Sequence, residues 1–280
     1  MGSICIITDN SAQFPHPNYP GRNLVKTASL KSYFGQKQNL EQWKTQNLPS
    51  VVDEELCPKL VAPTMDEFRQ LFIELGNSYR QILGIFLSSK LSDCYQNAEK
   101  AAKLLNGHDI QIVDSQTTSA SLGLMVQTAA QSIVEGATLV EAEHQVRSLI
   151  PQAYAVLCIP DLSYLHYNGF IDRTQALIGE MLGLLPIFTL EEGSLTPIEK
   201  LRSHRQITEF FLEFLDEFED LQHVALLQPV KTPAPDVNLL KEYSQKTFTS
   251  TTFSTHTINL PLATLFGPTC TALLVLENGG

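Results

Sequence analysis

Residues 82–98 read ILGIFLSSKLSDCYQNA, and this stretch contains the unit from which the fold is built. The run from Ile82 to Leu87 has no polar side chain, which is typical of a strand buried on both faces of a parallel sheet. Serines follow as far as Ser92, and apolar residues then recur at helical spacing: Leu91, Tyr95, Ala98, Ala102 and Leu105. The stretch therefore predicts a strand, a polar turn and a helix, which Asn106-Gly107 is expected to end.

The same order recurs on both sides of this stretch. Short apolar runs at 4–7 and 110–113 predict two more buried strands. Thr64 with Glu67, and Thr138 with Glu141, have the spacing of capping boxes that begin helices. Helices are expected from these two caps to about residues 75 and 150, and over 117–134. The alternation predicts a parallel sheet flanked by helices, in an N-terminal α/β domain of residues 1–153.

The second half of the chain is less regular. A hairpin is expected around Glu191-Glu192-Gly193, and residues 203–220 form an amphipathic pattern typical of a helix. The remaining expected elements are strands at 153–159, 224–227 and 272–276 and helices at 161–167 and 173–183. These elements predict a second α/β domain, residues 154–280, with a mixed or antiparallel sheet.

Composition excludes several classes of protein. The chain has 280 residues and a net charge of -11, which repels nucleic acid and anionic lipid headgroups. Its five cysteines lack CxxC spacing and its histidines lack an HExxH pair, so we expect no metal site and no disulfide framework. The N-terminus does not resemble a signal peptide, and no apolar run reaches the ~20 residues of a membrane span. We therefore expect a cytoplasmic protein.

Hydroxyl side chains follow two of the predicted strands at their carboxyl ends, where open α/β sheets bind ligands. They belong to Ser88, Ser89, Ser92 and Ser115. Hydroxyls beside the amide N–H groups of a helix start suit an anion such as a carboxylate. A simpler alternative is that Ser89 or Ser92 only caps the helix that follows.

Residues 88–98, SSKLSDCYQNA, resemble the signature SS-x-LSGTYQ-x-A of the DegV family. Six further segments match family motifs in the same order along the chain. They are Thr8-Asp9 with Ala12; Pro63-Thr64 with Glu67-Phe68; Val113-Asp114-Ser115 with Ser119 and Gly123; Asp161-Leu162 with Tyr164-Leu165 and Gly169; Pro186-Ile187 with Gly193 and Arg202; and Gly267-Pro268. Their number, order and spacing make the resemblance specific over nearly the whole chain.

The resemblance implies two α/β domains that hold a long-chain fatty acid in a cleft between them. Ser92 matches the serine that contacts the family's carboxylate, and the head-group end is expected to include Ser89, Asp93, Ser115 and Thr64 as well. The fatty-acid tail is expected against apolar residues of the second domain: Phe170, Leu185, Phe188, Leu265 and Phe266. For each of these five, ordinary core packing is the alternative. Some family members present the fatty acid to a separate kinase subunit.

Several positions depart from the family pattern, and they mark the chain as an atypical member. Leu60 stands where the family has a ligand threonine, Phe170 replaces an arginine and Leu265 replaces a histidine. Leu185 replaces a lysine, and Asp93-Cys94 replaces a Gly-Thr pair. A buried carboxylate without partners is costly. We therefore expect lipid binding to persist, with an acid that is protonated, or a less polar ligand, and we leave the kinase partnership open.

Function is predicted as binding and carrying an acyl group, without catalysis and without a cofactor. The sequence has no GxSxG elbow, no GxxxxGK[ST] loop and no GxGxxG fingerprint. One alternative is an enzyme acting on an acyl or other small substrate through Ser92, Asp93 or Asp114. Another is an interaction protein without a ligand.

Overall fold

The computed structural model describes residues 4–35, 38–39, 44–105, 109–230 and 235–279. The chain forms two compact units, one of Met1–Leu30 and Val61–Pro151, the other of Lys31–Leu60 and Gln152–Gly280. The second unit begins close to the expected residue 154. It also includes Lys31–Leu60, which the expectation of two continuous domains assigned to the first.

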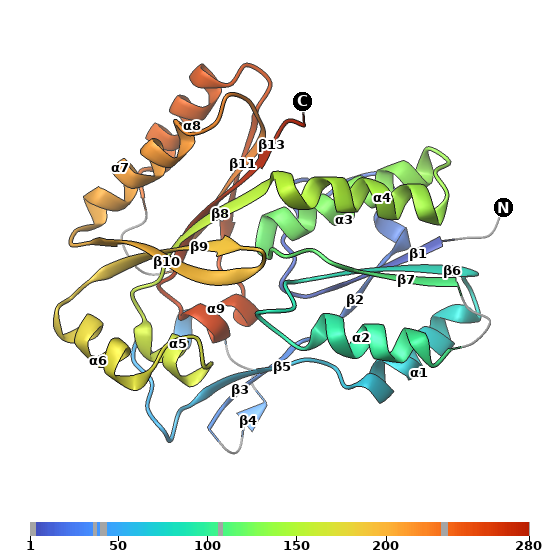
Figure 1. The fold of residues 1–280 in the computed structure, drawn as a ribbon, viewed down its shortest axis with the longest axis horizontal. Coiled ribbons are helices and arrows are strands. Elements are labelled where there is room, and N and C mark those ends of the chain that lie inside the picture. Colours follow the sequence, from blue (N-terminus) through green and yellow to red (C-terminus); the bar gives the residue numbers. More distant parts are fainter. Residues whose placement is uncertain (1–3, 36–37, 40–43, 106–108, 231–234, 280) are drawn as a thin grey trace. The chain divides into compact units, whose positions relative to one another are not determined.

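The first unit contains a four-stranded parallel sheet in the order β2-β1-β6-β7 (Figure 1). Its strands are β1 (Ile4–Asp9), β2 (Val25–Ala28), β6 (Gln81–Phe86) and β7 (Asp109–Asp114). Every residue of β1 is buried, as expected for a strand covered on both faces. The predicted parallel sheet is confirmed, and β2 is an additional strand at its edge.

Two pairs of helices cover the two faces of this sheet (Figure 1). The pairs are α1 (Met65–Gly76) with α2 (Cys94–Lys103), and α3 (Ser119–Val134) with α4 (Leu139–Leu149). Both predicted capping boxes are formed: Thr64 with Glu67 begins α1, and Thr138 with Glu141 begins α4. The predicted helix end at Asn106-Gly107 lies outside the described residues.

The second unit contains a six-stranded mixed sheet in the order β10-β9-β8-β13-β11-β12. Only β11 and β12 pair in parallel. The strands are β8 (Ala153–Cys158), β9 (Leu185–Glu191), β10 (Ser194–Leu201), β11 (Leu221–Gln228), β12 (Thr252–Thr257) and β13 (Thr271–Glu277). The predicted mixed sheet and the β9–β10 hairpin are confirmed.

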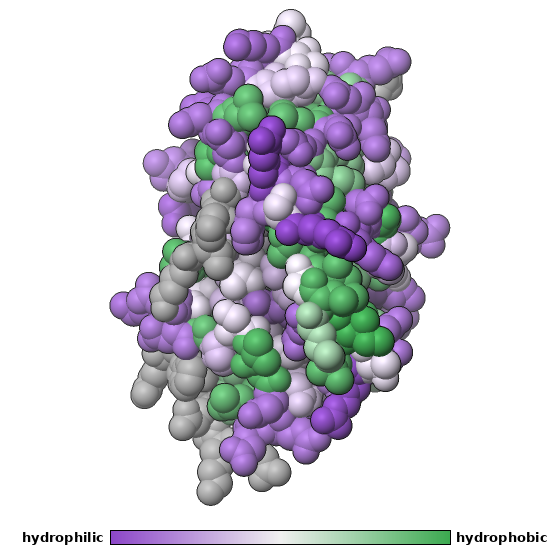
Figure 2. Space-filling view, turned by 90° about the vertical axis from the view of Figure 1, so that its left-hand side faces the viewer, coloured by the Kyte–Doolittle hydropathy of each residue, from purple (hydrophilic) through white to green (hydrophobic). Residues whose placement is uncertain are grey.

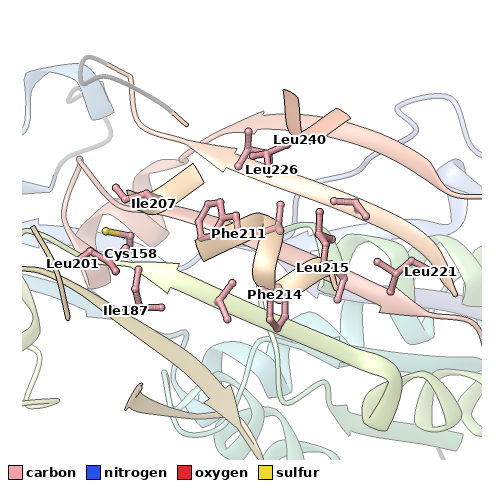
Figure 3. Packing of buried hydrophobic residues seen from close by; sticks show 14 of the residues in the cluster. Cys158, Ile187, Leu201, Ile207, Phe211, Phe214, Leu215, Leu221, Leu226 and Leu240 are labelled. Carbon is pink, nitrogen blue, oxygen red and sulfur yellow. The ribbon is translucent and has the colours of Figure 1, made fainter. Parts of the chain in front are cut away.

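Helices α7 (His204–Leu215) and α8 (Val237–Thr247) pack on one face of this sheet over its main apolar core. Figure 3 shows Phe211, Phe214 and Leu215 of α7 pointing toward side chains from the strands, among them Cys158 and Leu226. The predicted helix over 203–220 was too long. It ends at Leu215 with Asp216 as its cap, because an acidic run follows and negative charge is unfavourable at a helix C-terminus.

The second unit also contains short helices and a small sheet. The helices are α5 (Leu162–Tyr167), α6 (Arg173–Met181) and α9 (Leu260–Phe266), and the three-stranded sheet has the order β4-β3-β5. Its strands are β3 (Lys31–Phe34), β4 (Gln38–Asn39) and β5 (Pro58–Val61). None of the helices in the described part of the chain is long and apolar enough to cross a membrane.

Candidate functional site

The carboxyl ends of β1 and β6 meet where the strand order of the first sheet reverses. The chain passes from β1 to β2 on one side, and then to β6 on the other side of β1. Ligands of open α/β sheets bind at such a reversal, outside the carboxyl ends of the strands. The loops after β1, β6 and β7 therefore form the candidate site of this unit.

Asp9 joins the first two of these loops. It ends β1 with 1% of its surface exposed. Its Oδ1 accepts a hydrogen bond from the Ser11 N–H at 2.9 Å, and its Oδ2 accepts one from the Leu87 N–H at 2.8 Å. Burial raises the pKa of this carboxyl above its usual value. Sequence reasoning did not place Asp9 in the site, although a polar residue directly after an apolar strand was the signal for it.

The serine cluster forms a compact turn between β6 and α2. Ser88 is buried, and its Oγ accepts from the Lys90 N–H at 3.1 Å. Ser92 is half-buried, and its Oγ accepts from the Cys94 N–H at 3.3 Å, so it does contribute to the start of α2. The Ser92 hydroxyl hydrogen is not used in that bond and can donate to a ligand.

Asp114 connects this turn to the loop after β7. Its Oδ1 accepts from the N–H groups of Ser89, at 3.1 Å, and Gln116, at 3.0 Å. Ser115 is buried, and its hydroxyl donates to the Thr117 carbonyl at 3.2 Å. The structure thus brings Ser89, Ser92 and Ser115 to neighbouring loops, as the sequence predicted.

The loop after β1 joins the same arrangement through side chains that sequence reasoning missed. Thr118 donates to the Ser11 hydroxyl at 3.2 Å, and the Ser119 hydroxyl donates to Gln13 Oε1 at 2.8 Å. Ser119 begins α3 with φ 56°, a left-handed conformation that is unfavourable for a residue with a side chain. Such strain is found preferentially at functional sites.

Two of the predicted head-group residues, Thr64 and Asp93, are exposed. Thr64 is exposed, and its hydroxyl caps α1 by accepting from the Glu67 N–H at 3.2 Å. Asp93 is exposed at the start of α2. Asn97 of α2 donates to the Pro63 carbonyl at 2.9 Å, which brings the segment before α1 close to α2.

The predicted tail residues do not share one surface of the second unit. Leu185 packs against the core beneath α7. Phe188 lies three residues further along β9, so its side chain points to the opposite face of the sheet, beside Leu157 of β8. Leu265 and Phe266 are buried on α9.

Two further residues that depart from the family pattern, Phe170 and Leu60, also lie in the second unit. The Phe170 ring lies 6.3 Å from the ring of Phe266, centroid to centroid. Leu60 is half-buried on β5. Phe170 and Phe266 are therefore the two predicted tail residues with an observed ring contact.

Asp161 is a second buried carboxyl group, at the start of α5. Its Oδ2 accepts from the Thr269 N–H at 2.8 Å. Burial, the largest influence, raises the pKa of Asp161 to about 6, although the hydrogen bonds from Thr269 favour the ionised form. This group therefore stabilises the fold most when it is protonated.

Replacing Asp161 should change how stability depends on pH. Because its pKa is raised in the folded state, its favourable contribution is present below about pH 4 and is lost as pH rises from about 4 to 6. Asp161→Asn keeps an oxygen acceptor for Thr269 and removes the charge. We expect urea unfolding to show a variant that is about 1–3 kcal/mol more stable than the natural protein at pH 8, with little difference at pH 4.

The exposed Glu219→Gln is the matched control for this change, since it also removes one acidic charge. It should leave the pH dependence as in the natural protein. A parallel pH profile for Asp161→Asn would contradict the assignment.

A further polar cluster lies on β11 and β12 of the second unit. The Oγ of Ser254 is 2.8 Å from Nε2 of His223 and 2.9 Å from Nε2 of His256. Nδ1 of His223 is 2.6 Å from the Thr252 hydroxyl. Distant spacing in the sequence hid this pair of histidines. Hydrogen bonds of this kind join the edge strand β12 to its neighbour β11.

Other chemistry-bearing groups lie away from the predicted site residues. The buried thiols are weak nucleophiles, since burial raises the pKa of Cys5 to about 11 and that of Cys158 to about 12. No group of three or more His, Cys, Asp or Glu residues suited to a metal ion occurs among the described residues. A surface pocket of about 550 Å³ lies between α7 and α8, lined by His204, Arg205, Thr208, Glu209, Leu212, Asp236 and Leu239.

Helix α6 carries an exposed apolar stripe. Leu177, Ile178, Met181 and Leu182 are each more than half exposed, and Figure 2 shows apolar surface gathered on the side of the molecule where α6 lies. Apolar patches of this kind mark candidate interaction surfaces.

Comparisons with known proteins give one consistent result. Residues 3–278 match the model of the DegV family, described as uncharacterised proteins. A DegV domain-containing protein of Caldanaerobacter subterraneus is 28% identical over 226 residues, which cover 77% of each chain. The protein DegV of Bacillus subtilis is 26% identical over 220 residues, covering 77% of this chain and 78% of the relative.

Solved structures share the fold over the full length of the chain. A fatty-acid-binding DegV family protein from Thermus thermophilus superposes with a TM-score of 0.81 at 22% identity, covering 99% of this chain and 100% of the other. The fatty acid kinase B3 protein of Streptococcus pneumoniae, loaded with linoleic acid, superposes with a TM-score of 0.80 at 15% identity and the same coverage. With the family motifs in place from Thr8-Asp9 to Gly267-Pro268, this chain belongs to the DegV family.

Proposed function

We propose that this chain binds a long-chain fatty acid, or a similar acyl lipid, as a carrier or presenter of the acyl group and not as a catalyst. The observation that carries the proposal is the hydroxyl-lined site around Ser92, at the strand-order reversal of a DegV family protein. Several structural neighbours are fatty-acid-binding proteins, which supports the same ligand class. Free thiols on all five cysteines fit a reducing cytoplasm, where we place the protein.

The proposed head-group contacts are Ser92, Ser89 and Ser115, with Thr64 and Asp93 at the margin. Apolar side chains of the second unit are the proposed tail contacts, chiefly Phe170, Phe188, Leu265 and Phe266. Each buried methylene contributes about 0.8 kcal/mol, so a C16 chain supplies on the order of 10 kcal/mol before the costs of association. The tail therefore dominates affinity, and the head group decides orientation.

A fatty-acid kinase subunit is the proposed partner, by analogy with the neighbour from Streptococcus pneumoniae. Leu60, Phe170 and Leu265 replace polar residues of the family pattern, so this partnership needs its own test. Phosphorylation of the protein-bound acid by a DegV-associated kinase, measured with radiolabelled ATP, supports it. Lipid binding without phosphate transfer restricts the function to carriage.

The lipid proposal is tested directly by native mass spectrometry of the purified protein. We expect co-purified C16–C18 species, and calorimetric binding of added C16–C18 acids after delipidation. A protein that carries no lipid and binds none of these ligands would lack the proposed function.

Ser92→Ala should weaken binding of palmitic acid about tenfold, because one net hydrogen bond to the head group of about 1.4 kcal/mol is lost. Isothermal titration calorimetry of the delipidated protein measures this change. Ser148→Ala, an exposed serine on α4, is the matched control and should bind as the natural protein does. Full affinity in Ser92→Ala would show that Ser92 does not contact the head group.

A further inference from the structure

The amide groups of residues 88–92, in the turn after β6, are all bonded within the protein. Ser88 donates its N–H to the Thr117 carbonyl at 2.8 Å, and Ser89 donates to Asp114 Oδ1 at 3.1 Å. The next three amides, of residues 90–92, all donate to the hydroxyl or carbonyl oxygen of Ser88. Five successive N–H groups are therefore bonded within the protein before any ligand arrives.

Carboxyl groups of the protein itself occupy the places that an anionic ligand would take. Asp114 Oδ1 accepts from two amides that converge from different loops, those of Ser89 and Gln116. The carboxyl group of Asp9 accepts from the amide of Ser11 through Oδ1 and from the amide of Leu87 through Oδ2. Converging amides of this kind are anion-binding features in other proteins, and here they are filled.

The charges of the loops after β1, β6 and β7 also disfavour an anionic ligand. Residues 9–14, 87–93 and 114–119 contain three aspartates and one lysine, Lys90, which is exposed. A further negative charge among them is repelled by its neighbours and loses hydration. Both effects favour the neutral form of a bound acid.

Gln96 supplies an acceptor that needs a donor. Its Nε2 donates to the Ser89 carbonyl at 2.8 Å, which fixes the orientation of the amide because a carbonyl can only accept. Its Oε1 is buried and accepts no hydrogen bond from any residue that the structure describes. A buried acceptor without a donor is unfavourable, and a ligand O–H group placed there would supply the missing donor.

We infer that this site takes a lipid with an uncharged head group that carries an O–H, either an un-ionised carboxyl or an alcohol, and discriminates against a carboxylate. The inference rests on the proposed lipid-binding function and specifies its ligand class. The hydroxyls of Ser89 and Ser92 and the Gln96 Oε1 offer the matching donors and acceptor.

Calorimetry of the delipidated protein with dodecanoic acid, 1-dodecanol and methyl dodecanoate, each below its solubility limit, tests the inference between pH 5 and 8. We expect the apparent affinity for the acid to fall about tenfold per pH unit above its solution pKa, since only the neutral form binds. Affinity for the alcohol should not change with pH. At pH 8 the alcohol should bind at least tenfold more tightly than the acid. The ester lacks a donor and should bind about five- to tenfold more weakly than the alcohol.

Asp114→Asn provides a second measurement. It removes a negative charge but keeps an oxygen for the two amides, so affinity for the acid at pH 8 should rise severalfold while affinity for the alcohol stays the same. Asp109→Asn, at the other end of β7, is the matched control and should change neither. Acid binding that is independent of pH, together with at least tenfold weaker alcohol binding, would overturn the inference and leave lipid binding intact. Failure of all three ligands at every pH would overturn the proposed function, and the inference with it.

Discussion

Gly267→Ala is expected to destabilise the second unit by about 3 kcal/mol or more, and to lower the urea midpoint accordingly. Gly267 ends α9 with φ 84° and ψ 158°, a backbone conformation that residues with a side chain rarely adopt. A Cβ at this position would overlap Cβ and Oδ2 of Asp161 and lie 2.7 Å from its Cγ. Asp161 cannot retreat without losing its bond to the Thr269 N–H.

Gly183→Ala is the matched control for this prediction. Gly183 also has a positive φ, 59°, but a Cβ there meets nothing within 4 Å. It should cost only the backbone penalty of about 1–2 kcal/mol. Equal losses of stability in Gly267→Ala and Gly183→Ala would show that the overlap with Asp161 is relieved. Glycine would then be required at position 267 only for its φ.

Local patterns predicted the elements whose sequence signal lies within one segment. The apolar runs of β1, β6 and β7 and the capping boxes at Thr64 and Thr138 needed no knowledge of distant residues. The edge strand β12 was missed because its sequence TFSTHT lacks an apolar run, and it is defined by pairing with β11. Edge strands of this kind are specified by tertiary contacts more than by propensity.

Long-range contacts group residues 31–60 with the second unit. Ser32 accepts a hydrogen bond from the Thr264 hydroxyl at 2.8 Å, and the Pro49 carbonyl accepts one from the Tyr164 hydroxyl at 2.6 Å. Val52 donates its N–H to the Ser163 hydroxyl at 3.2 Å. These partners are more than 100 residues apart in the chain, and no periodicity in the sequence encodes them.

The candidate site shows the same limit. Serines and aspartates at the strand ends were visible in the sequence, but the hydrogen bonds by which Asp9 and Asp114 join different loops were not. Asp9 bonds to Leu87, and Asp114 bonds to Ser89, across different loops of the sheet. The sequence therefore indicated the strand ends at which the candidate site lies, and the structure was needed to show that the amides of residues 88–92 are already bonded within the protein.

Gly123→Ala should destabilise the first unit by about 2–4 kcal/mol, which is opposite in sign to the effect of helix propensity. Gly123 lies inside α3, where alanine is normally favoured by about 1 kcal/mol. A Cβ on Gly123 would overlap the Gln13 carbonyl oxygen, lying 2.7 Å from the Gln13 carbonyl carbon and 3.3 Å from Phe14 Cα. Urea unfolding followed by circular dichroism measures the change.

The backbone at Gln13 has little freedom to move away from such a side chain. Its N–H donates to the Ser119 carbonyl at 3.0 Å, and its Oε1 accepts from the Ser119 hydroxyl at 2.8 Å. Displacing Gln13 therefore displaces Ser119 and the loop after β1, so Gly123→Ala should also weaken lipid binding.

Gly179→Ala is the matched control. It also places alanine inside a helix, α6, but its Cβ meets only the end of the Leu162 side chain and no backbone atom. A flexible side-chain end can rotate, whereas Gln13 is held by one hydrogen bond of its backbone N–H and one of its side chain. Gly179→Ala should therefore change stability by less than about 1 kcal/mol. If Gly123→Ala proved as stable as the natural protein, α3 and the loop after β1 would not be in close contact. The role of that loop in the candidate site would then be lost.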